Sequence, residues 1–197
     1  SFAFSTFFLL KPIMSLISVL EETPAFFISF ITIIGLMVGS FLNVVIYRLP
    51  VMMKRSWLQQ CAELRDEPIA ELPVFNLITP RSACTQCGHK LSALENIPVI
   101  SYLFLRGRCS QCQTRISLCY PLVETVTALM SGFVAWHFGF GWLTVATLFF
   151  VWALIALAVI DLNTQLLPDD ITLPLLWAGL LVNMNKGFTD IHSAIIG

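Results

Sequence analysis

Four cysteines with a repeated spacing carry the strongest chemical signal in this sequence. They form two pairs of the pattern Cys-x-Gln-Cys, with 21 residues between the pairs: Cys84, Cys87, Cys109 and Cys112. Two thiolates three positions apart can reach one ion when the chain turns tightly between them, and Gly88 permits such a turn. Four thiolates supply the closed tetrahedral shell of a structural zinc ion, so we predict a zinc site at these cysteines.

The competing interpretations of the cysteine pairs are two disulfides or a thiol redox centre. A cytoplasmic segment is kept reduced, which disfavours stable disulfides. A closed zinc site would contribute folding free energy, about 10–16 kcal/mol in zinc-finger peptides, and would leave no open position for catalysis. His89 is expected at the surface because four thiolates are already available. We expect Cys61 and Cys119 to be ordinary buried or free thiols.

Asp161 is the second residue with chemical potential. It ends a long apolar run and is followed by a short polar loop that closes with Pro168, Asp169 and Asp170. A charged residue costs roughly 2.5–3.5 kcal/mol at the centre of a bilayer and less near its surface, so an acid in this position is a candidate functional residue. The alternative is a helix end that emerges into water, where an aspartate costs little. This stretch alone leaves both interpretations open.

The composition indicates the class of protein that must position these residues. The chain is 57% hydrophobic and 12% charged, with a mean hydropathy of +0.82. Soluble domains carry about 25% charged residues, so we predict an integral membrane protein in contact with the lipid bilayer. Nine of the eleven basic residues lie between Arg48 and Arg115, but five acids are interspersed among them. No basic stripe forms, and we predict no nucleic-acid partner.

Apolar segments divide the chain into about four predicted spans and the start of a fifth. The predicted helices cover residues 25–47, 122–140, 142–160, the short segment 171–184, and the segment from 191 onward. The predicted fold class is therefore an all-α polytopic membrane protein with a small cytoplasmic zinc-binding insertion.

Residues 48–121 form the predicted insertion between the first two spans. Arg48, Lys54 and Arg55 adjoin the first span, and positive charge beside a span favours the cytoplasmic side. The chain then crosses out and back, which predicts that Asp161 lies on the cytoplasmic side as well. We expect Pro50 to end the first helix and a short helix to follow over residues 57–65.

Three residues along one face of the first span favour close helix packing. Gly35 and Gly39 form a small-xxx-small pattern, and Asn43 lies one turn further along the same face. For Asn43 we favour a hydrogen bond to a neighbouring helix over a catalytic role.

Both ends of the sequence suggest a part of a larger membrane protein. The first residue is Ser1 and Met14 could be the natural start, so within the N-terminal segment 1–24 we assign no role to residues 1–13. The sequence ends seven residues into an apolar segment. We therefore expect 122–197 to be a truncated transmembrane region.

Several stretches, in the same order, resemble the type 4 prepilin peptidases of bacterial type IV pilus and type II secretion systems. They are Gly39-Ser-Phe-Leu-Asn-Val-Val-Ile-Tyr-Arg-Leu-Pro50, the two cysteine pairs, Glu95-Asn-Ile-Pro-Val-Ile-Ser-Tyr102, Arg106-Gly-Arg-Cys109, Tyr120-Pro-Leu-Val-Glu124, and Asp161 followed at a distance by Pro168-Asp169. The resemblance covers about residues 25 to 197.

The resemblance implies a bifunctional enzyme of the bacterial inner membrane. Such an aspartic peptidase cleaves the basic leader of type IV prepilins and pseudopilins at the cytoplasmic face. It then methylates the new N-terminus with S-adenosylmethionine. We find no recognisable methyl-donor motif in this sequence and assign that cofactor no residues.

The resemblance also implies that Asp161 is one of two catalytic aspartates, whereas Asp169 belongs to the motif without being the catalytic acid. The second aspartate of the family lies in a Gly-x-Gly-Asp motif, which this sequence lacks; Gly139-Phe-Gly-Trp142 has a tryptophan in place of the acid. We expect the partner beyond Gly197. Because two close carboxylates share a proton and divide the acid and base roles, this fragment is expected to be inactive as a peptidase on its own.

Two other functions remain open at this point. The first is a non-enzymatic membrane protein whose zinc module docks a partner, with Asp161 only at a helix end. The second is a thiol redox membrane protein that uses its cysteine pairs. Zinc content distinguishes the redox protein from the others, and substitution of Asp161 distinguishes the enzyme from the docking protein.

Overall fold

A computed structural model describes residues 18–66, 73–84, 86–92 and 94–196. The expectations for residues 1–13 lie outside these ranges. The helices are α2 (Pro24–Leu64), α3 (Ile100–Phe104), α4 (Cys119–Phe138), α5 (Trp142–Thr164), α6 (Asp169–Met184) and α7 (Ile191–Ile196). Among the described residues, pairing between extended segments is limited to two isolated bridges. The prediction of a mostly helical protein is confirmed.

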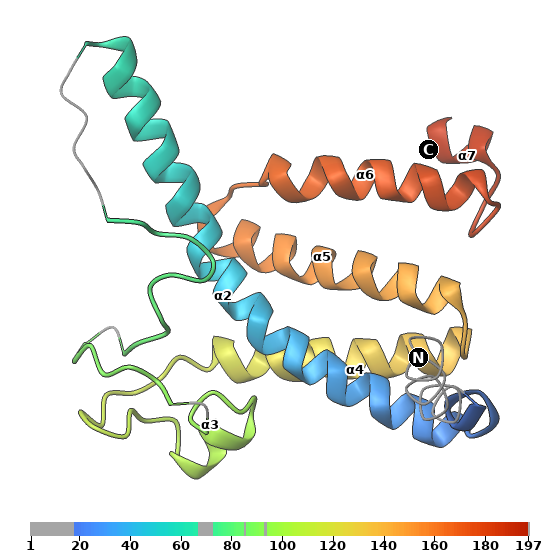
Figure 1. The fold of residues 1–197 in the computed structure, drawn as a ribbon, viewed down its shortest axis with the longest axis horizontal. Coiled ribbons are helices and arrows are strands. Elements are labelled where there is room, and N and C mark those ends of the chain that lie inside the picture. Colours follow the sequence, from blue (N-terminus) through green and yellow to red (C-terminus); the bar gives the residue numbers. More distant parts are fainter. Residues whose placement is uncertain (1–17, 67–72, 85, 93, 197) are drawn as a thin grey trace, which may run out of the picture.

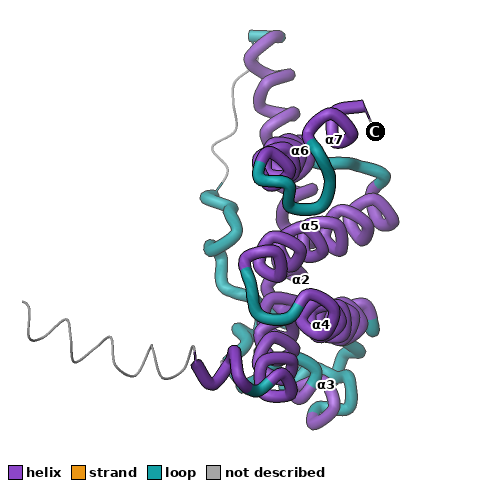
Figure 2. Tube along the Cα trace, turned by 90° about the vertical axis from the view of Figure 1, so that its right-hand side faces the viewer, coloured by secondary structure: helices purple, strands orange, loops and turns teal. Residues whose placement is uncertain are grey.

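The helices α2, α4 and α5 pack against one another, and α6 lies beside α5 (Figure 1). The described part of the connection after α2 and the α5–α6 connection lie at one end of this arrangement, whereas the α4–α5 and α6–α7 turns lie at the other (Figure 1). Figure 2 shows the same helices after a turn of 90°. The insertion and the loop after Asp161 therefore share one end of the helices.

Helix α2 is a single helix of 41 residues that continues through Pro50. The expectation that Pro50 ends the helix is wrong, and the short helix expected over 57–65 is the last part of α2. Apolar contacts lie on both sides of the proline: Leu49 is buried against Ile160 of α5, and Met53 packs on the same cluster. These contacts support the helix on both sides of the proline, which removes one main-chain hydrogen bond, and α2 changes direction about midway along its length (Figure 1).

Two of the helices, α2 and α5, are long and apolar enough to cross a membrane. Large apolar side chains also remain exposed on the helices, among them Phe149 on α5 and Trp177 on α6. A water-soluble monomer rarely leaves so much apolar surface uncovered. The structure therefore points to a membrane protein.

Gly35 and Gly39 bring α2 close to α4, as the small-xxx-small pattern predicts. A Cβ atom at Gly39 would lie 2.7 Å from the Cα of Glu124 and 3.1 Å from the Cβ of Thr127. A Cβ at Gly35 would collide with the side chain of Ser131. Side chains larger than hydrogen at these positions would push the two helices apart.

Candidate metal centre and active site

The four predicted zinc ligands lie together. The Sγ atoms of Cys84, Cys87, Cys109 and Cys112 all lie within 4.8 Å of one another. The Sγ atoms of Cys84 and Cys112 are 3.7 Å apart, and those of Cys87 and Cys109 are 3.9 Å apart. Four sulfur atoms bound at about 2.3 Å to one zinc ion would lie roughly 3.8 Å from each other. The cluster therefore has the dimensions and donor atoms of a tetrahedral metal site.

Both cysteine pairs fold in the same way, so the repeat in the sequence is a repeat in structure. The N–H of Cys84 donates to the carbonyl of His89 (2.8 Å), and the N–H of Gly88 donates back to the carbonyl of Cys84 (3.0 Å). In the second pair, the N–H of Cys109 donates to the carbonyl of Thr114 (2.9 Å), and the N–H of Gln113 donates back to the carbonyl of Cys109 (3.1 Å). Gly88 and Gln113 occupy equivalent places, and both have a positive φ, 71° and 56°.

The thiol groups differ in their tendency to ionise. Hydrogen bonds from the side chain and main chain of Thr114 lower the pKa of Cys112 to about 6. Main-chain N–H groups of Cys87 and Gln86 lower the pKa of Cys84. A main-chain hydrogen bond from His89 favours the Cys87 thiolate, but desolvation and the neighbouring sulfur atoms outweigh it and raise its pKa to about 11. Four thiolates therefore need a cation among them.

Glu95 joins the two cysteine pairs. Its carboxylate accepts hydrogen bonds from the Ser110 hydroxyl in the second pair and from the main-chain N–H of Ser92 after the first. It also lies 3.4 Å from His89 Nε2. The Ser110 hydroxyl, together with Ser92 and His89, lowers the pKa of Glu95 to about 2. His89 thus contacts Glu95 and is half-buried rather than fully exposed at the surface as expected.

Cys61 and Cys119 lie outside the cluster, and the six cysteines of the chain are free of disulfides. Cys61 is exposed on α2, and Cys119 is half-buried at the start of α4. The expectation of ordinary thiols is confirmed for both.

Arg48 holds the insertion against α2. Its side chain is only 7% exposed, and its guanidinium donates to the main-chain carbonyls of Asn76 (2.8 Å) and Pro80. The same guanidinium lies over the ring of Phe75, 5.7 Å from its centre. A buried charge is tolerable when it is hydrogen-bonded in this way. Sequence reasoning treated Arg48 only as a topology signal.

Glu124 anchors the insertion from α4. It is 8% exposed, and its carboxylate accepts the main-chain N–H of Val99 (2.7 Å), the residue before α3. Asn43 of α2 donates to the same carboxylate (3.4 Å) and to the carbonyl of Tyr120 (3.1 Å). Asn43 thus makes the interhelical hydrogen bonds that the sequence favoured. A cavity of about 620 Å³ lies between the insertion and these two helices.

Asp161 lies in the last turn of α5 and is exposed to solvent. The N–H of Gln165, a residue with φ of 53°, donates to its carbonyl (2.8 Å) and ends the helix. The preceding residue, Ile160, is fully buried against α2 and α4. Asp161 is therefore held firmly at the end of the helices where the insertion also attaches.

The helix dipole distinguishes Asp161 from the two acids that follow it. Asp169 and Asp170 stand in the first turn of α6, where negative charge stabilises a helix. Asp161 stands at the C-terminal end of α5, where the dipole disfavours a carboxylate. Helix stability thus explains the later acids but not Asp161.

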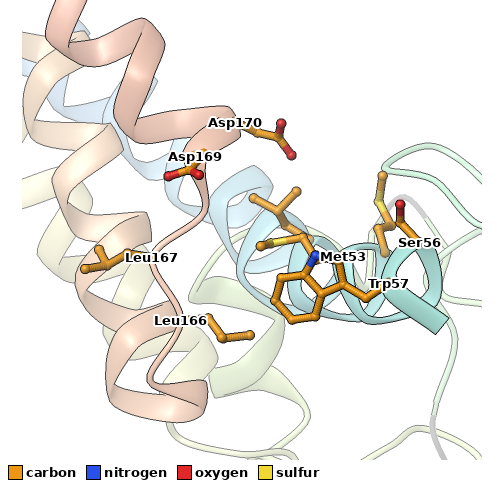
Figure 3. A pocket seen from close by; sticks show the side chains of 9 residues that line it. Met53, Ser56, Trp57, Leu166, Leu167, Asp169 and Asp170 are labelled. Carbon is orange, nitrogen blue, oxygen red and sulfur yellow. The ribbon is translucent and has the colours of Figure 1, made fainter. Parts of the chain in front are cut away.

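A groove lies between the second half of α2 and the segment that joins α5 to α6. We call it the α2–α6 groove; it has a volume of about 570 Å³. It is lined by Leu49, Met52, Met53, Ser56, Trp57, Leu166, Leu167, Asp169 and Asp170. Figure 3 shows the acids and the leucines on one side and the α2 side chains on the other. Sequence reasoning missed this groove because it assumed that α2 ended at Pro50.

Two family models match the chain. The Bacterial Peptidase A24 N-terminal domain matches residues 33–138, and the Type IV leader peptidase family matches residues 148–197. No solved structure matches the chain.

Curated relatives are similar over most of the chain. A protein of Pseudomonas aeruginosa is 48% identical over 185 residues, one of Pseudomonas putida 50% over 184, and one of Neisseria gonorrhoeae 47% over 186. Each is named prepilin leader peptidase/N-methyltransferase, and each match covers 93% of this chain and 64% of the relative. The chain thus spans less than two thirds of the length of these relatives.

Proposed function

Because this chain belongs to the bacterial peptidase A24 family of type IV leader peptidases, we propose that it is part of a membrane aspartic peptidase that cleaves prepilin leaders. The proposed substrates are type IV prepilins and pseudopilins, and the same enzyme methylates the new N-terminus with S-adenosylmethionine. The names of the curated relatives support both activities. No residue of this chain is assigned to the methyl donor.

The proposed topology has four spans, in α2, α4, α5 and α6, and a fifth that begins near residue 191. The insertion 48–121 and Asp161 lie on the cytoplasmic side of the inner membrane in this proposal. Its support is the position of both at the same end of the helices and the basic residues beside the first span.

Asp161 is the proposed catalytic acid of this chain. The observation that carries this role is its exposed carboxylate in the last turn of α5, where it does not serve helix stability. In peptide hydrolysis by two carboxylates, one ionised aspartate takes a proton from water while a protonated one polarises the carbonyl. The proposed partner carboxylate lies outside residues 1–197, so we expect this segment alone to cleave no prepilin.

Substitution of Asp161 in the intact enzyme tests the proposal. Asp161→Asn should abolish leader cleavage of a purified prepilin, because an amide can neither accept the proton nor share one. The control is Asp190→Asn, which removes an acid beyond the far end of α6. Prepilin cleavage that survives Asp161→Asn, in a protein whose helical content is unchanged, would show that the proposed mechanism is wrong.

The four-cysteine cluster is proposed to hold one structural zinc ion. The sulfur separations fit a tetrahedral zinc site, and all four positions of the metal would be filled by protein, so the ion would fold the insertion rather than bind substrate. Cys109→Ser should reduce the zinc content from one ion per chain to a small fraction. Cys61→Ser, at an exposed thiol outside the cluster, is the matched control. Full zinc content in the Cys109 variant would rule out this ligand set.

A further inference from the structure

The α2–α6 groove combines an apolar surface with two carboxylates. Met53 and Trp57 face it from α2, and Leu166 contributes from the opposite side (Figure 3). Asp169 and Asp170 stand at its edge and are exposed. The volume of about 570 Å³ falls within the range of clefts that bind a molecule of drug size, about 300–1,000 Å³.

The two carboxylates have no cationic partner among the described residues. Within 18–66, 73–84, 86–92 and 94–196, the one contact between a basic and an acidic side chain joins His89 and Glu95, both of which lie in the insertion and do not line the groove. Arg55 is a nearby cation on α2, but its guanidinium lies 4.5 Å from the centre of the Phe75 ring and binds the insertion. Among the described residues, no side-chain cation is paired with either acid, so the groove carries two unpaired carboxylates.

The edge of the groove is rigid. Pro168 is fully buried, and its carbonyl accepts the N–H groups of Ile171 (3.0 Å) and Thr172 (3.1 Å). Asp169 also accepts the Thr172 hydroxyl (3.4 Å). The main chain of both acids is thus fixed in the first turn of α6, which places both carboxyl groups at this edge before anything binds.

We propose that the α2–α6 groove binds the basic segment of the peptide substrate that Asp161 cleaves. Lysine or arginine side chains of the substrate pair with Asp169 and Asp170, and their carbon stems lie on Trp57 and Met53. Charge complementarity selects this occupant, because two unpaired carboxylates repel nucleic acid and anionic lipid headgroups. The proposal rests on the proposed peptidase function and makes Asp169 and Asp170 residues of substrate specificity.

The aromatic and sulfur-containing side chains suit such a segment. A cation over an indole face gains about 0.5–1 kcal/mol at an exposed site, and Trp57 is 46% exposed. Methionine side chains adapt to different apolar stems. Asp161 does not line the groove; it lies in the last turn of α5, just before the segment that contributes Leu166 and Leu167.

Kinetics of the intact enzyme with two substrates test the proposal. One prepilin carries its basic leader, and the other carries glutamine at each lysine and arginine of the leader. The double substitution Asp169→Asn and Asp170→Asn should lower kcat/KM for the basic leader by about 2–30-fold, because each exposed charge pair contributes only about 0.2–1 kcal/mol. The loss should lie in KM, with kcat changed less than about 2-fold, and it should shrink at high salt.

The neutral leader separates recognition from folding. The double variant should cleave it as well as the parent enzyme does, and Asp190→Asn should leave both substrates unaffected. An equal loss for basic and neutral leaders would overturn the proposal, since it would mean that the acids only stabilise the start of α6. Reversing both charges provides a further test. The Asp170→Lys enzyme should cleave a leader that carries glutamate in place of lysine better than the parent enzyme does.

A photo-crosslinker at position 57 tests the occupant directly. The probe is p-benzoylphenylalanine in place of Trp57, used with the Asp161→Asn background so that the substrate stays intact. Adducts with the substrate leader support the proposal, and adducts confined to the enzyme itself or to lipid overturn it. A failure of the proposed peptidase mechanism would give a different result: the Asp161→Asn enzyme would still cleave the prepilin, independently of which molecule the crosslinker at position 57 labels.

Discussion

Replacement of Gly39 by alanine tests how closely α2 and α4 approach. The new Cβ would lie 2.7 Å from the Cα of Glu124, a main-chain neighbour that cannot rotate away. Overpacking of this kind costs about 1–3 kcal/mol. The higher helix propensity of alanine returns about 1 kcal/mol. We expect Gly39→Ala to lower the free energy of unfolding by about 0–2 kcal/mol in total.

Gly179→Ala is the matched control, since Gly179 lies within α6 and nothing lies within 4 Å of its added Cβ. It makes the same change in helix propensity without a collision and should stabilise the protein by about 1 kcal/mol. Equilibrium unfolding in mixed detergent micelles, followed by tryptophan fluorescence, measures both variants. Equal changes at Gly39 and Gly179 would refute the close approach of α2 and α4.

Three further predictions concern the attachment of the insertion. Glu124→Gln keeps an acceptor for the Val99 N–H but sets an amide against Asn43; we expect a loss of about 1–2 kcal/mol and faster hydrogen exchange at Val99. Arg48→Met leaves the partly exposed carbonyls of Asn76 and Pro80 without their charged donor and should loosen the insertion by about 1–2 kcal/mol, measured as faster proteolysis within residues 73–82. Removal of zinc by a chelator should open Cys109 to alkylation while helical circular dichroism changes little, because α2, α4 and α5 pack without the metal. Protection of Cys109 after complete zinc removal would contradict the last prediction.

The sequence predicts what local chemistry determines. Two Cys-x-Gln-Cys pairs specify four sulfur atoms around one point, and Gly39 and Asn43 specify a close and hydrogen-bonded helix contact. The membrane-length stretch before Asp161 likewise predicts α5, which extends to Thr164. In each case a few residues at fixed spacing are sufficient for the inference.

Long-range packing determines what the sequence could not predict. A proline within a helix usually breaks or kinks it, so Pro50 is expected to end α2. The contacts of Leu49 and Met53 with the α5 cluster explain why α2 continues. The α2–α6 groove depends on that continuation. The roles of Arg48 and Glu124 were hidden for another reason: both bind main-chain groups of the insertion, which leave no signature in the side-chain sequence.

This choice of partners affects which substitutions the insertion tolerates. Arg48 binds the carbonyl of Pro80, and Glu124 accepts the N–H of Val99. Both main-chain groups remain when most other side chains replace those of Pro80 and Val99. Proline at position 99 is the exception, since it has no N–H to donate. The attachment of the insertion to the helices therefore depends more on the path of its main chain than on its side chains. The outer surface of the insertion can change while this attachment stays the same.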